Sequence, residues 1–120
     1  MARLDHIVIN ASDVGASVGF YDRLAPVIGF VKEAAHIYRN AQGAARDVRQ
    51  ANAPDFRYAR HEPGVNHIAV GVDFEAEADD IARQLAQTGI AVPPTQRLHE
   101  AYAVFIPDPD GLRVEISYEP

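Results

Sequence analysis

The sequence predicts an α+β fold in which one strand–helix–strand–strand–strand module occurs twice. The first observation is a repeat, because residues 4–10 and 65–71 both place a histidine inside an alternating run rich in β-branched residues. His6 and His67 are 61 residues apart, about half of the 120-residue chain. The second observation is that helix-capping residues and apolar helix positions recur at the same offset. A module used twice would place the two histidines at equivalent positions.

Composition indicates one ordinary globular domain over residues 1–120, with 48% hydrophobic and 23% charged residues. A net charge of −6 argues against a nucleic-acid partner, since phosphate binding needs a basic surface. No apolar run is long enough to cross a membrane, and we expect no signal peptide before the first strand. The absence of cysteine excludes disulfides and thiolate metal sites. It fits a reducing cytoplasm, which is the expected location.

The first half begins with a strand over residues 3–10, where alternation places His6 on the same face as Asn10. Ser12 and Asp13 are cap residues before a helix with an apolar stripe. Pro26 predicts that this helix ends at residue 25. Further strands are expected at residues 27–33, 36–41 and 45–51.

The second half repeats this order, starting with a strand over residues 65–72. Asp73 is the expected cap of a second helix, and Gly89 is expected to end it. Strands follow at residues 90–92, 101–106 and 112–118, with a tight turn over 108–111.

The chain therefore divides into a first module over about residues 1–53, a connector over about 54–64 and a second module over about 65–120. Each helix would cover one face of its sheet, and the other face could curve around a ligand.

Alternation along the last strand separates Glu115 from its aliphatic neighbours and turns it toward this concave face. His6 and His67 face the same way. Two imidazoles and one carboxylate would leave positions for water and substrate, and would favour Fe, Mn, Ni, Co or Zn over Ca. The alternative is that each is an ordinary strand residue, because lone histidines and acids in antiparallel strands usually face solvent.

Each of three further residues has two possible roles. Gln50 is a candidate fourth ligand or substrate contact, or else a surface residue. Tyr102 could donate its hydroxyl proton to a substrate, or pack in the core. Arg113 could bind an anionic group, or pair with an acid.

Three motifs give the chain a resemblance to the vicinal oxygen chelate superfamily, which includes glyoxalase I and the fosfomycin resistance, bleomycin resistance and extradiol dioxygenase proteins. They are LDHIVI at 4–9 followed by Phe20-Tyr21, GVNHIAV at 64–70, and DPDGLRVE at 108–115. The resemblance implies paired βαβββ modules forming a cupped mixed sheet, with His6, His67 and Glu115 as metal ligands. It also implies a homodimer.

The resemblance leaves the reaction open. Glyoxalase I carries an additional acid late in its first module, where this chain offers Arg49 and Gln50. The three-ligand pattern is more similar to fosfomycin-modifying enzymes, for which Arg97 and Arg113 could bind the phosphonate. It is also similar to extradiol dioxygenases, for which His99 and Tyr102 could be base and tyrosine.

The sequence thus predicts a divalent-metal enzyme acting on a small molecule that chelates through two oxygens, with Glu115 and Tyr102 as catalytic residues and Gln50, Arg113 and His99 as substrate contacts. Lyase or isomerase, thiol transferase and dioxygenase chemistry all remain open. The alternatives are a binding protein without catalysis, like bleomycin resistance proteins, and a metal-binding protein that has lost its activity.

Overall fold

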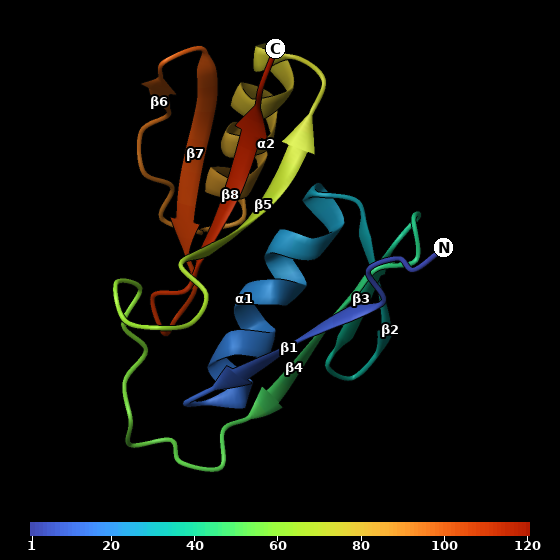
Figure 1. The fold of residues 1–120 in the computed structure, drawn as a ribbon, viewed down its shortest axis with the longest axis vertical. Coiled ribbons are helices and arrows are strands. Elements are labelled where there is room, and N and C mark those ends of the chain that lie inside the picture. Colours follow the sequence, from blue (N-terminus) through green and yellow to red (C-terminus); the bar gives the residue numbers. More distant parts are fainter. The chain divides into compact units, whose positions relative to one another are not determined.

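Each half of the chain folds as a four-stranded mixed sheet with one helix against it, as a computed structural model of all 120 residues shows (Figure 1). The elements are, in order, β1 (His6–Ala11), α1 (Val14–Val27), β2 (Phe30–Ala34), β3 (Ile37–Asn40), β4 (Ala45–Gln50), β5 (His67–Val72), α2 (Glu75–Gln87), β6 (Gln96–Leu98), β7 (Ala101–Pro107) and β8 (Arg113–Tyr118). The sheets have the strand orders β1-β4-β3-β2 and β5-β8-β7-β6. The predicted α+β fold with two βαβββ modules is confirmed.

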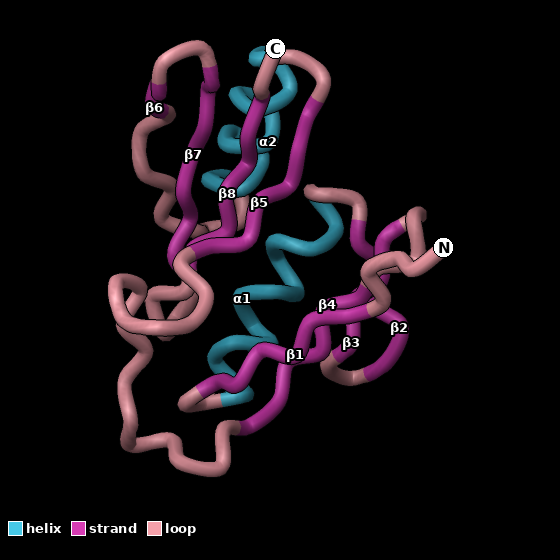
Figure 2. The backbone as a smooth tube through the Cα atoms, viewed as in Figure 1, coloured by secondary structure: helices cyan, strands magenta, loops and turns pink.

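The chain forms two compact units, Met1–Arg57 and Tyr58–Pro120, which we call the first and second units. The boundary lies in the long loop between β4 and β5, which is drawn in pink in Figure 2. Tyr58 belongs to the second unit, because its hydroxyl donates to the backbone carbonyls of Val65 and Asn66. No helix in either unit is long and apolar enough to cross a membrane.

In each unit the strand before the helix pairs in parallel with the last strand, and the remaining pairs are antiparallel. His6 lies opposite Ala45 in the first parallel pair, and His67 lies opposite Arg113 in the second. The two histidines are therefore the first residues of equivalent strands. In each unit the helix packs on one face of the sheet.

The core of each unit lies between its sheet and its helix. In the second unit Val114 and Ile116 of β8 are fully buried together with Leu85 of α2. Burying each such side chain contributes about 1.5–3 kcal/mol. This packing commits Val114 and Ile116 to the helix side, so Glu115 between them faces away from α2.

Two helix boundaries differ from those predicted. Helix α1 continues through Pro26 to Val27, because a proline this late in a helix removes only one hydrogen bond of the final turn. The backbone N–H of Ile28 then closes the helix on the carbonyls of Leu24 and Ala25. Asp73 does not cap α2, whose N-cap is Phe74 without a side-chain hydrogen bond.

The strand predicted at residues 90–92 is absent, and the edge strand is instead β6 at Gln96–Leu98. Pro93 and Pro94 explain the shift, since neither has a backbone N–H to donate to a ladder. Ile90 is nevertheless buried. The predicted end of α2 at Gly89 is confirmed, because Gly89 follows the C-cap residue Thr88 with φ of 93°.

We predict opposite stability effects for two glycine-to-alanine substitutions. Gly89→Ala should lower the free energy of unfolding by about 1–2 kcal/mol, because alanine is strained at positive φ. Gly19→Ala should raise it by up to about 1 kcal/mol, since Gly19 is a helical position where an added Cβ would meet no atom within 4 Å. Urea unfolding of both variants checks this, and equal effects would contradict the assigned conformations.

Candidate metal centre

His67 and Glu115 meet on the face of the second sheet that points away from α2. His67 Nε2 lies 2.9 Å from Glu115 Oε2. The parallel register places Glu115 opposite Ala69, so His67 reaches it diagonally from the end of the neighbouring strand. Glu115 is only 8% exposed, whereas the His67 side chain is 37% exposed. A nearly buried carboxylate is therefore presented to one accessible imidazole nitrogen.

The orientation of the His67 ring is set by Asn66. Asn66 Nδ2 donates to the carbonyl of Arg60, which fixes its amide oxygen toward the imidazole. That oxygen lies 2.8 Å from His67 Nδ1 and also accepts from Arg113 Nη2. Because an amide oxygen can only accept, Nδ1 must carry the proton. The other nitrogen, Nε2, points to Glu115, to which it donates when it also carries a proton. Without that proton, Nε2 is the nitrogen that could ligate a metal.

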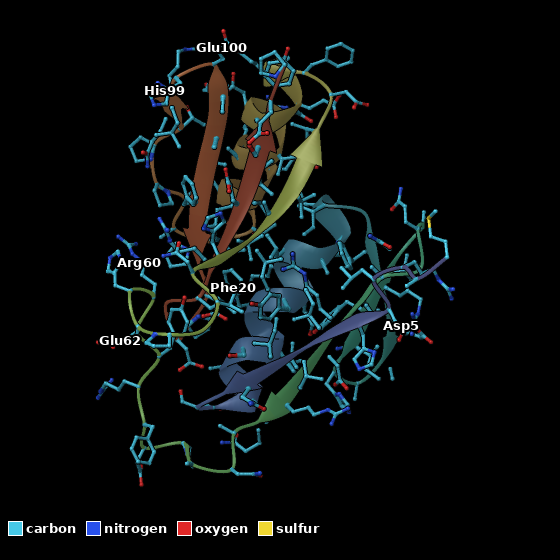
Figure 3. The ribbon with its side chains drawn as sticks, in the orientation of Figure 1. Asp5, Phe20, Arg60, Glu62, His99 and Glu100 are labelled. Carbon is cyan, nitrogen blue, oxygen red and sulfur yellow. The ribbon has the colours of Figure 1, made fainter.

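His6 has the same arrangement in the first unit. Its Nδ1 lies 2.7 Å from Oδ2 of Asp5, which directly precedes β1 (Figure 3). The hydrogen bond from His6 lowers the pKa of the Asp5 carboxyl, so this group is an ionised acceptor. Nδ1 therefore donates and Nε2 is left to bind. The sequence pattern assigned no role to Asp5 or Asn66, although each is the polar residue directly before a predicted ligand.

The donor set fits a divalent transition metal. Two imidazole nitrogens with protonated opposite positions and one carboxylate suit Fe, Mn, Co, Ni or Zn. His67 and Glu115 belong to the second unit and His6 to the first. Neither unit by itself gathers three histidine or acidic side chains at one point. The structure brings together the pair His67 and Glu115, and the complete triad stays a prediction.

Comparison with known proteins identifies the family. Residues 3–116 match the family model described as Glyoxalase/Bleomycin resistance protein/Dioxygenase superfamily. The chain belongs to this superfamily. It is also similar to a virulence protein of Salmonella typhimurium, with 26% identity over 96% of this chain and 83% of that protein.

Solved structures of the glyoxalase superfamily share the fold. A glyoxylase/bleomycin resistance protein/dioxygenase domain from Frankia has a TM-score of 0.77 and 17% identity, over 100% of this chain and 93% of that chain. A lactoylglutathione lyase from Agrobacterium tumefaciens has a TM-score of 0.66 and 20% identity, over 98% and 94%. A glyoxalase/dioxygenase from Nostoc punctiforme has a TM-score of 0.70 and 19% identity, over 98% and 91%. At these identities the likeness concerns the fold alone.

In this glyoxalase-superfamily chain, Asp47 occupies the position in the first unit that Glu115 occupies in the second. Asp47 lies opposite Val8 on β1, as Glu115 lies opposite Ala69 on β5. The sequence repeat conceals this match, since the two acids are 68 residues apart while the histidines are 61 apart. Differing loop lengths between helix and last strand account for the change.

Asp47 is nearly buried and held by two partners. Arg49 donates to its Oδ2 at 2.8 Å from Nε, and His36 Nδ1 lies 2.8 Å from its Oδ1. Arg49 and, to a smaller extent, His36 hold the pKa of the Asp47 carboxyl below its usual range. The carboxylate is thus ionised and fixed on the sheet face that points away from α1.

Gln50, which the sequence offered as a fourth ligand or substrate contact or else as a surface residue, does not lie beside Asp47. Alternation along β4 turns it to the α1 side, where its Oε1 accepts from the backbone N–H of Val14 and its Nε2 donates to the carbonyl of Ser12. Gln50 instead satisfies backbone groups at the start of α1.

Tyr102 lies on the opposite face from Glu115, so its position does not support the predicted catalytic role. Its hydroxyl donates to Asp79 of α2 at 2.6 Å and is hydrogen-bonded to Thr95. Arg97 lies on this helix side as well, where it forms two hydrogen bonds with Glu75 and lies over the Tyr102 ring. The strand register decides this, because Tyr102 and Arg97 are paired neighbours.

Arg113 and His99 have different surroundings. Arg113 lies over the Phe105 ring, 4.5 Å from its centroid, and supports Asn66 beside His67. His99 lies in the β6–β7 turn with φ of 57° (Figure 3). It is six residues from Phe105, the β7 residue paired with Glu115, which is roughly 20 Å along a strand. The predicted substrate contact from His99 is therefore not supported near Glu115.

We predict a pH-dependent stability difference for Asp47→Asn. The folded-state pKa of Asp47 is below its unfolded value, so its stabilising effect is present above the unfolded pKa and is lost as pH falls through the folded pKa. At pH 7 the variant should lose about 1 kcal/mol of unfolding free energy. The difference should shrink below about pH 4. Urea unfolding across this range measures it, with Asp55→Asn in the exposed loop as control. A difference independent of pH would contradict the assignment.

Proposed function

We propose that this protein is a divalent-metal-dependent enzyme of the glyoxalase superfamily that acts on a small molecule chelating through two neighbouring oxygens. His6, His67 and Glu115 would hold the ion, which would be Fe, Mn, Ni, Co or Zn. One observation carries the proposal: each histidine has its Nδ1 hydrogen-bonded to the side chain of the preceding residue. This arrangement presents Nε2 for coordination at two equivalent strand positions.

The chain's own residues orient and support the site. Asp5 and Asn66 fix the two rings, and Arg113 with Phe105 packs beside His67. Glu115 would supply the anionic ligand. When bound, such a metal acts as a Lewis acid that stabilises a developing oxyanion or enediolate on the substrate.

Among the reaction types, lyase or isomerase chemistry keeps the most support. Asp47 is an acid late in the first module at the register position equivalent to Glu115, and it would suit the additional acid that the resemblance to glyoxalase I implies. The dioxygenase alternative loses support because Tyr102 faces α2. The fosfomycin-type alternative loses support because Arg97 is paired with Glu75.

A second candidate is a non-catalytic binding protein. Val8 and Val31 are exposed apolar side chains on the first sheet, at 40% and 73%. Register places both on the face that points away from α1, where they could contact an apolar ligand. Metal binding distinguishes the two candidates, since this alternative does not need the histidines.

We also propose a homodimer, in which His6 of one subunit completes the site formed by His67 and Glu115 of the other. Each unit has one sheet face that no helix covers, and a second chain could bury that face in a dimer interface.

We propose a cytoplasmic location, because a chain without cysteine needs no oxidising compartment.

Metal content tests the proposal. Protein purified without an affinity tag should contain close to one metal ion per chain, and His6→Ala, His67→Ala or Glu115→Ala should abolish this. Asn66→Ala should weaken binding by about 10- to 100-fold, because the ring of His67 loses its orientation. Elemental analysis and titration with Zn(II) or Mn(II) measure both effects.

His61→Ala is the matched control, since His61 is an exposed loop histidine. Far-UV circular dichroism should show that each variant is folded. A folded wild-type protein that takes up no transition metal and gains no thermal stability from any of them would favour the binding-protein alternative.

Mixing two inactive variants tests the shared site. If His6 completes the partner's site, unfolded and co-refolded His6→Ala and Glu115→Ala chains should recover about a quarter of the wild-type metal content, because half of the dimers are mixed and each has one intact site. Recovery close to zero, in mixtures shown by native mass spectrometry to contain mixed dimers, would place all three ligands within one chain.

A further inference from the structure

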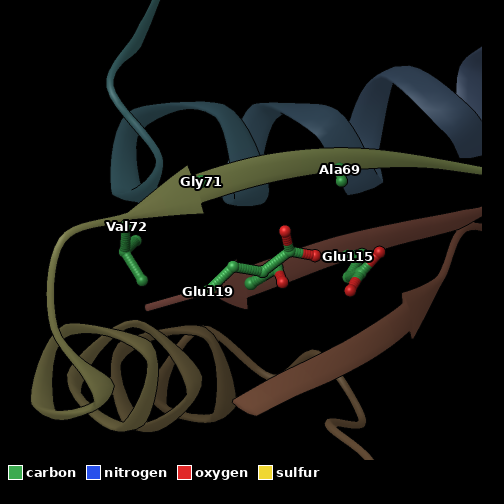
Figure 4. A pocket seen from close by; sticks show the side chains of 6 residues that line it. Ala69, Gly71, Val72, Glu115 and Glu119 are labelled. Carbon is green, nitrogen blue, oxygen red and sulfur yellow. The ribbon is translucent and has the colours of Figure 1, made fainter. Parts of the chain in front are cut away.

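A small hollow extends along the second sheet from Glu115 toward the ends of β5 and β8. Its volume is about 300 Å³. Figure 4 shows it from close by, with the lining residues Ala69, Gly71, Val72, Glu115, Ser117 and Glu119. The hollow belongs entirely to the second unit. It adjoins the proposed ligand Glu115 on the side where the chain continues toward Ser117.

Ser117 is a buried polar side chain without a partner at this hollow. It is only 7% exposed, and its Oγ has no hydrogen-bond partner. The register places it opposite Gly71 and two residues beyond Glu115, on the same face of β8. Buried hydroxyl groups in folded proteins are almost always hydrogen-bonded. The unpaired Oγ therefore points to a ligand with a complementary polar group.

Small residues create the space above Ser117. A Cβ added at Gly71 would meet no atom within 4 Å, and the φ angle of Gly71 is not positive. Neither sterics nor backbone conformation therefore requires glycine at this strand position. The nearest residue on the same face of β5 is Ala69, which is also small. The hollow exists because these two positions lack larger side chains.

The charged side chains that line the hollow determine which ligands it would attract. Two carboxylates line it, and the Glu119 side chain extends toward Glu115 in Figure 4. No basic side chain is among the lining residues. Arg113, two residues before Glu115, is turned to the Phe105 ring and Asn66. Glu119, which is not among the proposed metal ligands, would repel an anionic group here and attract a protonated amine or a hydroxyl group.

We propose that this hollow is a substrate subsite that takes the amine- or hydroxyl-bearing end of the substrate and excludes carboxylates and phosphonates. Glu119 would pair with the cationic or donor group, and Ser117 would form a hydrogen bond beside it. Calling the ligand a substrate rests on the proposed function. The subsite itself can be measured with or without metal.

Three matched probes test the subsite on the ¹⁵N-labelled full chain: 3-amino-1,2-propanediol, glycerol and glycerate, which differ mainly in charge at one end. In metal-free protein the amine should shift the amide resonances of Gly71 and Ser117, with the lowest Kd of the three. Glycerol should bind more weakly, and glycerate weakest. Glycerate binding as tightly as the amine, or no probe affecting these resonances, would overturn the proposal.

Variants give an independent readout. Gly71→Val should fill the hollow while suiting the strand, and should weaken amine binding at least about tenfold. Ser117→Ala should weaken it about fivefold by loss of one hydrogen bond. Glu119→Gln should bring the amine to the affinity of glycerol, whereas Glu62→Gln in the exposed loop should have no effect. Unchanged amine binding in Gly71→Val would overturn the proposed location.

Zn(II) stoichiometry on the same samples separates this proposal from the proposed function. Intact metal binding without the predicted order of probes overturns the subsite alone. The predicted order of probes in protein that takes up no metal supports the subsite and overturns the metal-dependent enzyme.

Discussion

Alternation along the two parallel strand pairs, β1–β4 and β5–β8, determines which side chains are available for chemistry. In the second unit Val114 and Ile116 must face α2 to be buried, so Glu115 between them has to face the other way. A slip of one residue would move the apolar side chains into water and Glu115 against the helix. Core packing therefore fixes the register, and the register fixes the position of Glu115 beside His67.

Local hydrogen bonds determine which ring nitrogen each of the two histidines presents. A histidine on a strand can present either ring nitrogen, and the choice depends on what binds the other. Asp5 and Asn66 each bind Nδ1 of the following histidine and leave Nε2 available, although one is a carboxylate and the other an amide. Their common feature is an acceptor oxygen within reach of Nδ1. The sequence repeat thus extends beyond the histidines to the residues that orient them.

The sequence predicts both helices, the face of Glu115 and every strand but one because these follow from periodicity, and the exception is the edge strand β6, which the sequence places at residues 90–92. It fails where a side chain has two acceptable environments. Tyr102 is amphipathic, and only the pairing of β7 with β6 and β8 shows that its hydroxyl reaches Asp79. Gln50 is polar at a strand end, yet it faces a helix start whose backbone groups need partners. The equivalence of Asp47 and Glu115 cannot be seen in the sequence repeat, because loop lengths differ between the two modules.

We propose that His6 and His67 both bind the metal ion through Nε2. ¹⁵N NMR of histidine-labelled protein during Zn(II) addition tests it most directly, because ring nitrogen shifts report protonation and coordination separately. We expect His6 and His67 to coordinate through Nε2 and to keep the proton on Nδ1, while the resonances of His36, His61 and His99 are unchanged. Coordination through Nδ1, or His6 and His67 resonances that do not respond to Zn(II), would contradict it.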